Sequence, residues 1–198
     1  MHHKSYFSLF KLHRLEVFET KYLYFWLLLF TIAYPIAQSF EKRLKFASTW
    51  KRLFPAILIM MLVFIPWDIW FAKSDVWHFN DKYVLGFYLF ELPLEEWLFF
   101  IIVPFACVFI YEVLNYFFPA VKSQKTSKIF LLILSIFLAI VGFLNLSQIY
   151  TSFCFLFTSA SILMLLFFNP HWINKFLRAY LVSLLPFLLI NGFLTGYF

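Results

Sequence analysis

The stretch "LPLEEWLFFIIVPFACVFIYEVLNYFF", residues 92–118, joins a long apolar run to two adjacent carboxylates at its start. About 20 apolar residues suffice for a helix to cross a bilayer. Pro93 suits the first turn of such a helix, where its missing N–H costs nothing. Glu95 and Glu96 then fall in that turn, where the helix dipole favours negative charge. The stretch therefore predicts a membrane-spanning helix that carries two acids at its N-terminal end.

The composition of the whole chain supports a membrane protein. Hydrophobic residues make up 64% and charged residues 13% of the 198 residues, whereas a soluble domain is about 45–50% apolar and about 25% charged. No alternating apolar and polar pattern typical of a transmembrane β-barrel is evident, and helices satisfy backbone polar groups in lipid. We therefore expect an all-α, polytopic bundle of six to seven transmembrane helices.

Six apolar runs are long enough to be spans. Before them, residues 1–21 mix apolar and basic residues and are predicted to form an interfacial amphipathic segment. Residues 22–198 then form a single transmembrane domain. The predicted spans are Tyr22–Phe40, Phe54–Phe71, Pro93–Phe118, Ile129–Leu146, Ile149–Phe168 and Phe176–Phe198.

A weak tandem repeat of three-helix units divides that domain. Residues 49–72 and 173–196 both begin with basic residues and continue as an apolar span. Each span has a polar residue near its far end, Asp68 in the first and Asn191 in the second. The first repeat is predicted at about 22–118 and an incomplete second repeat at about 149–198, with 129–146 as a linking span.

Charge in the loops predicts the orientation. Segments 41–52, 121–128 and 169–178 are alternate connections and hold ten of the sixteen basic residues. The positive-inside rule makes this side cytoplasmic and places 72–92 outside. A multi-pass protein of the cell (plasma or inner) membrane is the expectation, although the basic N-terminal segment then falls on the outer side.

The acids suggest a chemical site. Asp68 ends one span on the side where Glu95 and Glu96 begin the next, so the three carboxyls are expected to converge. Carboxyl groups that are close and poorly solvated cannot all ionise, and one that keeps its proton is a Brønsted acid. Such an acid can protonate a carbon–carbon double bond.

Aromatic side chains near these acids could stabilise the resulting cation through their π faces. Those that adjoin the acids are predicted to contact the substrate, together with Asn191 of the second repeat, whereas Trp70 and Trp77 fit an interfacial aromatic belt. The predicted contacts are Trp67, Trp97, Phe99, Phe100, Tyr88 and Asn191. No dinucleotide, P-loop or metal-ligand motif occurs in the sequence, so the expected chemistry is acid–base, with no cofactor or metal.

The motifs "PWD" (66–68), "LPLEEWLFF" (92–100) and "YEVLNYF" (111–117) resemble the small membrane lycopene cyclases of bacteria, archaea and fungi. Their signature, Pro-x-Glu-(Glu/Asp)-x-x-Phe-Phe, is similar to the segment from Pro93 to Phe100. The resemblance implies proton-initiated closure of the ψ-ends of lycopene to β-ionone rings, without a cofactor. It also implies that Glu95 donates the proton, while Glu96 and Asp68 tune it and balance the cation.

The resemblance implies partners as well. Lycopene would enter from the bilayer among membrane lipids, and no nucleic acid is expected. Fused members carry a second acidic helix after the equivalent of residues 188–196. Here that helix is either lost, part of a longer chain, or supplied by a homo- or hetero-oligomer.

Other functions remain open at this point. Water capture of the cation would make a carotenoid hydratase, and loss of catalysis would leave a carotenoid-binding subunit. A proton- or ion-conducting protein is the alternative of another class, but a relay needs ionisable groups at successive depths. Here the acids gather at one level. The sequence leaves open the ring type, the number of rings and the oligomeric state.

Overall fold

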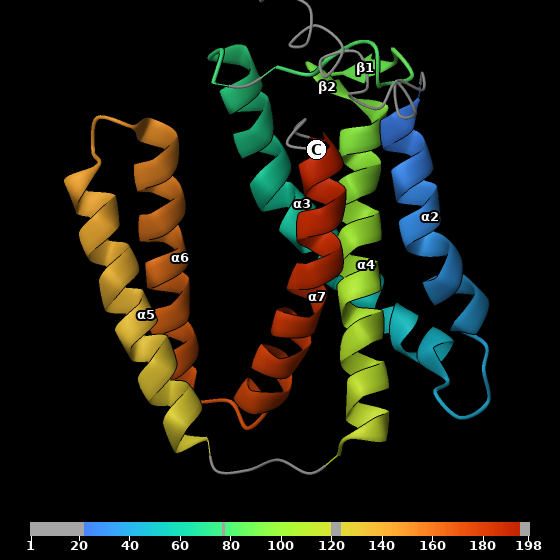
Figure 1. The fold of residues 1–198 in the computed structure, drawn as a ribbon, viewed down its shortest axis with the longest axis vertical. Coiled ribbons are helices and arrows are strands. Elements are labelled where there is room, and N and C mark those ends of the chain that lie inside the picture. The colour runs from blue at the N-terminus through green and yellow to red at the C-terminus, as the bar shows by residue number, and fades with distance from the viewer. Residues whose placement is uncertain (1–21, 77, 120–123, 195–198) are drawn as a thin grey trace, which may run out of the picture. The chain divides into compact units, whose positions relative to one another are not determined.

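The computed structural model describes residues 22–76, 78–119 and 124–194. Within them the chain forms six α-helices, one short 3-10 helix and one two-stranded hairpin (Figure 1). The predicted amphipathic segment 1–21 lies outside the described residues. The elements are α2 (Leu23–Gln38), η2 (Phe46–Thr49), α3 (Trp50–Lys73), β1 (Tyr88–Leu89), β2 (Leu92–Pro93), α4 (Leu94–Phe117), α5 (Lys125–Leu144), α6 (Ile149–Phe168) and α7 (Ile173–Leu194).

These helices confirm the predicted all-α membrane architecture. Each predicted span corresponds to one helix, and α6 begins and ends where the sequence predicts. Five helices are long and apolar enough to cross a membrane, while α2, with 16 residues, is shorter. The last four residues of the predicted final span, 195–198, lie outside the described part of the chain.

The chain divides into two compact units, which we describe separately. Unit 1 contains α2 up to Ala37, and residues 50–105 with α3, the hairpin and the first half of α4. Unit 2 contains residues 38–49 and 106–194, with the second half of α4 and α5 to α7. In unit 1 the start of α2, the end of α3, the hairpin and the start of α4 lie at the same end (Figure 1).

The hairpin was not foreseen, and it corrects the predicted place of Pro93. Pro93 lies in β2, opposite Tyr88 of β1, and α4 begins one residue later. A proline can occupy this position because it needs no ladder donor there. The Leu94 N–H then donates to the Phe87 carbonyl at 2.8 Å, so the hairpin leads directly into α4.

The hairpin loop has an unusual backbone. Phe90 and Glu91, its two loop residues, have φ values of 53° and 71°. Two positive φ values define the type I′ turn, which matches the twist of the flanking strands but normally uses Asn and Gly. Phe90 and Glu91 therefore hold a conformation that bulky side chains rarely adopt.

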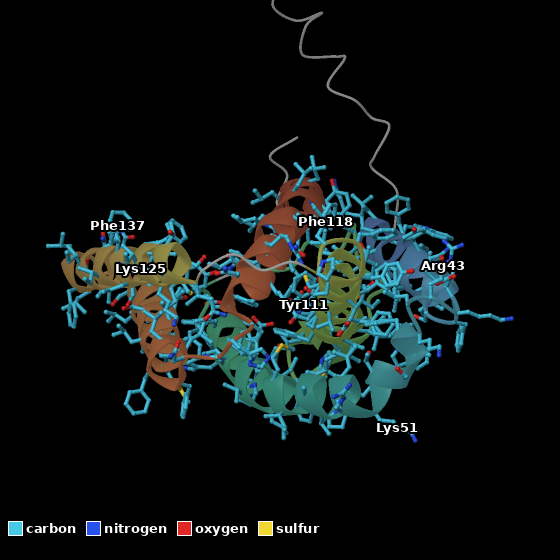
Figure 2. The ribbon with its side chains drawn as sticks, turned by 90° about the horizontal axis from the view of Figure 1, so that it is seen from below. Arg43, Lys51, Tyr111, Phe118, Lys125 and Phe137 are labelled. Atoms are coloured by element: carbon cyan, nitrogen blue, oxygen red, sulfur yellow. The ribbon has the colours of Figure 1, made fainter. Side chains whose placement is uncertain are left out.

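In unit 2, α5 and α6 pack through small residues. Ser159 Oγ donates to the Ser135 carbonyl at 2.8 Å, and the two hydroxyl oxygens lie 3.0 Å apart. Small and hydroxyl residues let transmembrane helices approach closely and bond to each other. Phe137 points away from α6 (Figure 2) and is exposed, as a lipid-facing side chain would be.

At one end of unit 2, α7 is tied to the end of α4. Arg178 donates to the Phe118 carbonyl at 2.7 Å, and to the Leu114 carbonyl and the Asn115 side chain at 3.1 and 3.0 Å. A cation is favourable at this position because a helix leaves its last carbonyls unpaired. Figure 2 views this end, with Lys125 labelled at the start of α5. Its assignment to the cytoplasmic side remains a prediction.

Candidate functional site

The first turn of α4 places Glu95 in the interior of unit 1. The Glu95 side chain is 0% exposed. Its Oε1 accepts a hydrogen bond of 2.6 Å from the Leu85 backbone N–H, while its Oε2 is buried and has no hydrogen-bond partner among the described residues. Burial of a carboxyl group with one oxygen lacking a hydrogen bond costs free energy, which marks Glu95 as a candidate functional residue.

Glu96 is held differently from its neighbour. Its Oε2 accepts a hydrogen bond of 2.7 Å from the Tyr24 hydroxyl, which α2 contributes. Tyr24 is buried. Adjacent residues on a helix point about 100° apart, which explains why one acid meets α2 and the other meets the loop before the hairpin.

Asp68 completes the group from α3. It is buried, and its Oδ2 has no hydrogen-bond partner in the described part of the chain. Asp68 lies on α3, while Glu95 and Glu96 lie in the first turn of α4, and all three acids belong to unit 1 with Tyr24. Unit 1 thus brings the three predicted acids together, although their catalytic roles remain predictions.

Four of the predicted aromatic contacts lie on α3 and α4, the helices that carry the acids. Trp67 stacks on Phe64 with ring centroids 5.6 Å apart. Trp97 donates from Nε1 to the Leu89 carbonyl at 3.4 Å. Phe99 and Phe100 meet edge to face at 5.9 Å. Such π faces can attract a cation.

The other two predicted substrate contacts do not lie on α3 or α4. Tyr88 lies on the hairpin, partly exposed, and its hydroxyl donates to Asp81 Oδ1 at 2.5 Å. Asn191 lies on α7 in unit 2. Its role at the site remains a prediction.

Tyr88 should titrate at unusually high pH. Partial burial raises the pKa of its phenol to about 12, and the hydrogen bond and charge of Asp81 and the nearby Glu95 carboxyl act in the same direction. The folded protein favours the neutral phenol, so this contribution to stability is complete below about pH 10 and is lost as the pH rises towards about 12.

The absorbance difference between the wild-type protein and Tyr88→Phe measures this titration. We expect Asp81→Asn to lower the Tyr88 pKa because it removes the acceptor's charge. An unchanged titration in Asp81→Asn would contradict the assigned cause.

The sequence analysis missed two parts of the site. One is Tyr24, and the other is the segment from Tyr83 to Leu85, which supplies the N–H that binds Glu95. A signal for Tyr24 existed: the predicted alternation of spans places the start of the first span at the level of the acids. The role of segment 83–85 depends on loop geometry that no sequence pattern indicates.

Chemically, the site offers buried acids beside aromatic faces. Within the described residues, no group of three His, Cys, Asp or Glu side chains is arranged to hold a metal ion. A fully buried carboxyl with an unpaired oxygen can keep and deliver a proton. Fold and site together define a mainly helical membrane protein with a group of buried acids among its helices.

Comparison with known proteins identifies the family. The sequence profile of lycopene cyclase matches residues 21–114 and 147–198, most of the chain. The protein therefore belongs to the lycopene cyclase family, which confirms the resemblance drawn from the sequence.

Curated relatives agree over shorter segments. A bifunctional lycopene cyclase/phytoene synthase of Aspergillus oryzae is 29% identical over 66 residues, 33% of this chain and 11% of that protein. The protein of the same name from Colletotrichum graminicola is 36% identical over 59 residues, 30% of this chain and 10% of its own length. The chain thus spans about a tenth of these relatives. No solved structure matches it.

Proposed function

We propose that this protein is a lycopene cyclase that closes the ψ-ends of lycopene to β-ionone rings by acid catalysis. The observation that carries the proposal is Glu95 beside Glu96 and Asp68. It is a fully buried acid whose Oε2 has no hydrogen-bond partner among the described residues, in a member of the lycopene cyclase family. Cyclisation is an isomerisation, so atoms balance without an oxidant or reductant.

The reaction begins with proton transfer from Glu95 Oε2 to the terminal double bond of a ψ-end. The tertiary cation that forms is attacked by a second double bond of the same chain, which closes a six-membered ring. Loss of a proton from the carbon beside the new cation then gives the β-ionone ring. Glu96 and Asp68 balance the cation's charge, and one of them accepts the departing proton, which returns to Glu95.

Lycopene is wholly apolar, so its source is the bilayer. Exposed apolar side chains cover α3, α5, α6 and α7, and extensive apolar surfaces of this kind mark contacts with a membrane or with other proteins. We place the protein in the cell membrane with its basic loops in the cytoplasm. An oligomer that supplies a second acidic helix remains a prediction.

Pigment analysis tests the proposal directly. Cells that make lycopene and express this chain should contain monocyclic or bicyclic carotenoid, whereas cells with an empty vector should retain lycopene. Purified protein in lipid vesicles with lycopene alone should give the same product.

The other functions predict different results. A hydratase would give hydroxylated acyclic carotenoid, and a binding subunit would retain lycopene unchanged. A proton conductor would instead dissipate a pH gradient across vesicles. Any of these results in place of ring formation would overturn the proposal.

A further inference from the structure

We propose that Gly86 is a positioning residue for the acid site. Its left-handed backbone allows the loop of residues 83–87 to hold Glu95 and the start of α4 in one arrangement. The catalytic meaning of this inference rests on the proposed function. The arrangement itself depends on hydrogen bonds of backbone amides, so it can be measured without turnover.

The loop binds the start of α4 on both sides of Gly86. Before it, the Leu85 N–H donates to Glu95 Oε1 at 2.6 Å. After it, the Phe87 carbonyl accepts a hydrogen bond of 2.8 Å from the Leu94 N–H. Leu94 and Glu95 are the first two residues of α4. Two neighbouring residues of the helix are thus bound by loop groups that have only Gly86 between them.

The part of the loop before Gly86 is also fixed to α2 and to the interior of unit 1. The Tyr83 carbonyl accepts a hydrogen bond of 3.1 Å from the Tyr24 N–H, and the Tyr24 hydroxyl in turn donates to Glu96 at 2.7 Å. The next residue, Val84, is buried with 3% of its surface exposed. This part of the loop therefore cannot shift as a whole without breaking contacts with α2 and the core.

The backbone of Gly86 is what connects these fixed points. Its φ is 84°, a value that residues with a side chain rarely adopt. Among the described residues, no heavy atom lies within 4 Å of the place that a Cβ atom would occupy. A side chain at this position would therefore meet no steric obstacle, and its effect would come from the backbone conformation alone.

Gly86→Ala should displace the acid. The new side chain disfavours the positive φ, and the chain can relax here because residue 86 is exposed. Relaxation changes the direction of the chain after Leu85, so Glu95 loses the donor that fixes its side chain. The cost of a left-handed residue corresponds to about 5- to 30-fold in an equilibrium. We expect kcat for cyclisation to fall by about this factor, with KM little changed because the loop holds the acid rather than the substrate.

Hydrogen exchange measures the loop arrangement directly. In the wild-type protein in lipid nanodiscs, the Leu85 amide should exchange slowly because it donates to buried Glu95. Gly86→Ala should speed this exchange by about 5- to 30-fold, the same backbone cost. Glu95→Ala removes the acceptor and should also speed it, which identifies the signal of this bond. Unchanged exchange of the Leu85 amide in Gly86→Ala would overturn the inference, whatever reaction the protein catalyses.

Two further substitutions at Gly86 vary the backbone preference. Asn adopts a positive φ more readily than Ala, whereas β-branched Val hardly adopts it. The loss of kcat and the gain in Leu85 exchange should therefore both increase in the order Asn, Ala, Val. Equal effects of Gly86→Asn and Gly86→Ala would show that the backbone conformation is not the cause and would refute the proposal. That comparison decides the test even if Gly86→Val fails to fold.

Asp75→Ala is the matched control. Asp75 is exposed and also has a positive φ, of 55°, but its N–H donates to the Ala72 carbonyl at the end of α3. The substitution should lower thermal stability through the same backbone cost, without changing kcat or the exchange of the Leu85 amide. A loss of kcat equal to that of Gly86→Ala would indicate general destabilisation and refute the positioning role.

The positioning role and the proposed function fail in different ways. If the wild-type protein forms no ring from lycopene, the proposed function fails, while the exchange measurements still decide how the loop is held. Faster exchange of the Leu85 amide in Gly86→Ala with an unchanged kcat would refute the positioning role in a working cyclase.

Discussion

Lycopene should accumulate without cyclic product when Glu95 is replaced by Gln. The substitution keeps the volume of the side chain and an oxygen that can accept the Leu85 N–H at Oε1, but it removes the transferable proton. General acid catalysis contributes about 10²–10⁴-fold to a rate. We expect ring formation to fall by at least this factor in Glu95→Gln, measured by chromatography of pigments at equal protein level.

Two matched variants separate loss of the acid from loss of the fold. Glu96→Asp keeps a carboxylate at the neighbouring position and should retain activity. Glu112→Gln changes an acid on the same helix, α4, but far from the first turn, and should act mainly on protein level. Ring formation by Glu95→Gln at the wild-type rate would place the proton donor elsewhere.

Gly142→Leu should strongly destabilise the α5–α6 hairpin. A Cβ atom at Gly142 would lie 2.8 Å from Leu156 Cγ and 3.3 Å from the Leu156 backbone N. Neither distance fits an ordinary contact, so the helices must separate, which also weakens the hydrogen bonds between Ser135 and Ser159. Overpacking of this kind costs about 1–3 kcal/mol, and the lost bonds add to it.

Thermal unfolding of the purified protein in lipid or detergent measures this effect. Gly86→Ala is a useful contrast because open space surrounds Gly86, although its positive φ of 84° carries a backbone cost of its own. Equal midpoints for Gly142→Leu and the wild-type protein would show that α5 and α6 do not depend on this close approach.

The helices were predictable because each corresponds to a continuous apolar run in the sequence that is about as long as a membrane span. The convergence of Asp68 with Glu95 and Glu96 followed from the alternating direction of successive spans. These inferences need only helix length and chain direction, both of which are local properties of the sequence.

The hairpin and the partners of the acids were not predictable in this way. The strands have two residues each, and the loop of Phe90 and Glu91 lacks the Gly and Asn that normally indicate a type I′ turn. The contact between Tyr24 and Glu96 joins residues 72 positions apart. No local pattern encodes such a contact, since it arises only when the helices pack.

The direct junction between the hairpin and α4 limits how this protein can vary in length. Tyr88 pairs with Pro93 and Leu94 bonds to Phe87, so no spare residue separates the hairpin from the acid-bearing turn. One inserted residue after Leu94 would rotate the acids by about 100° around the helix axis and turn Glu95 away from Leu85. The segment 87–96 must therefore keep its length for Glu95 to reach the Leu85 N–H.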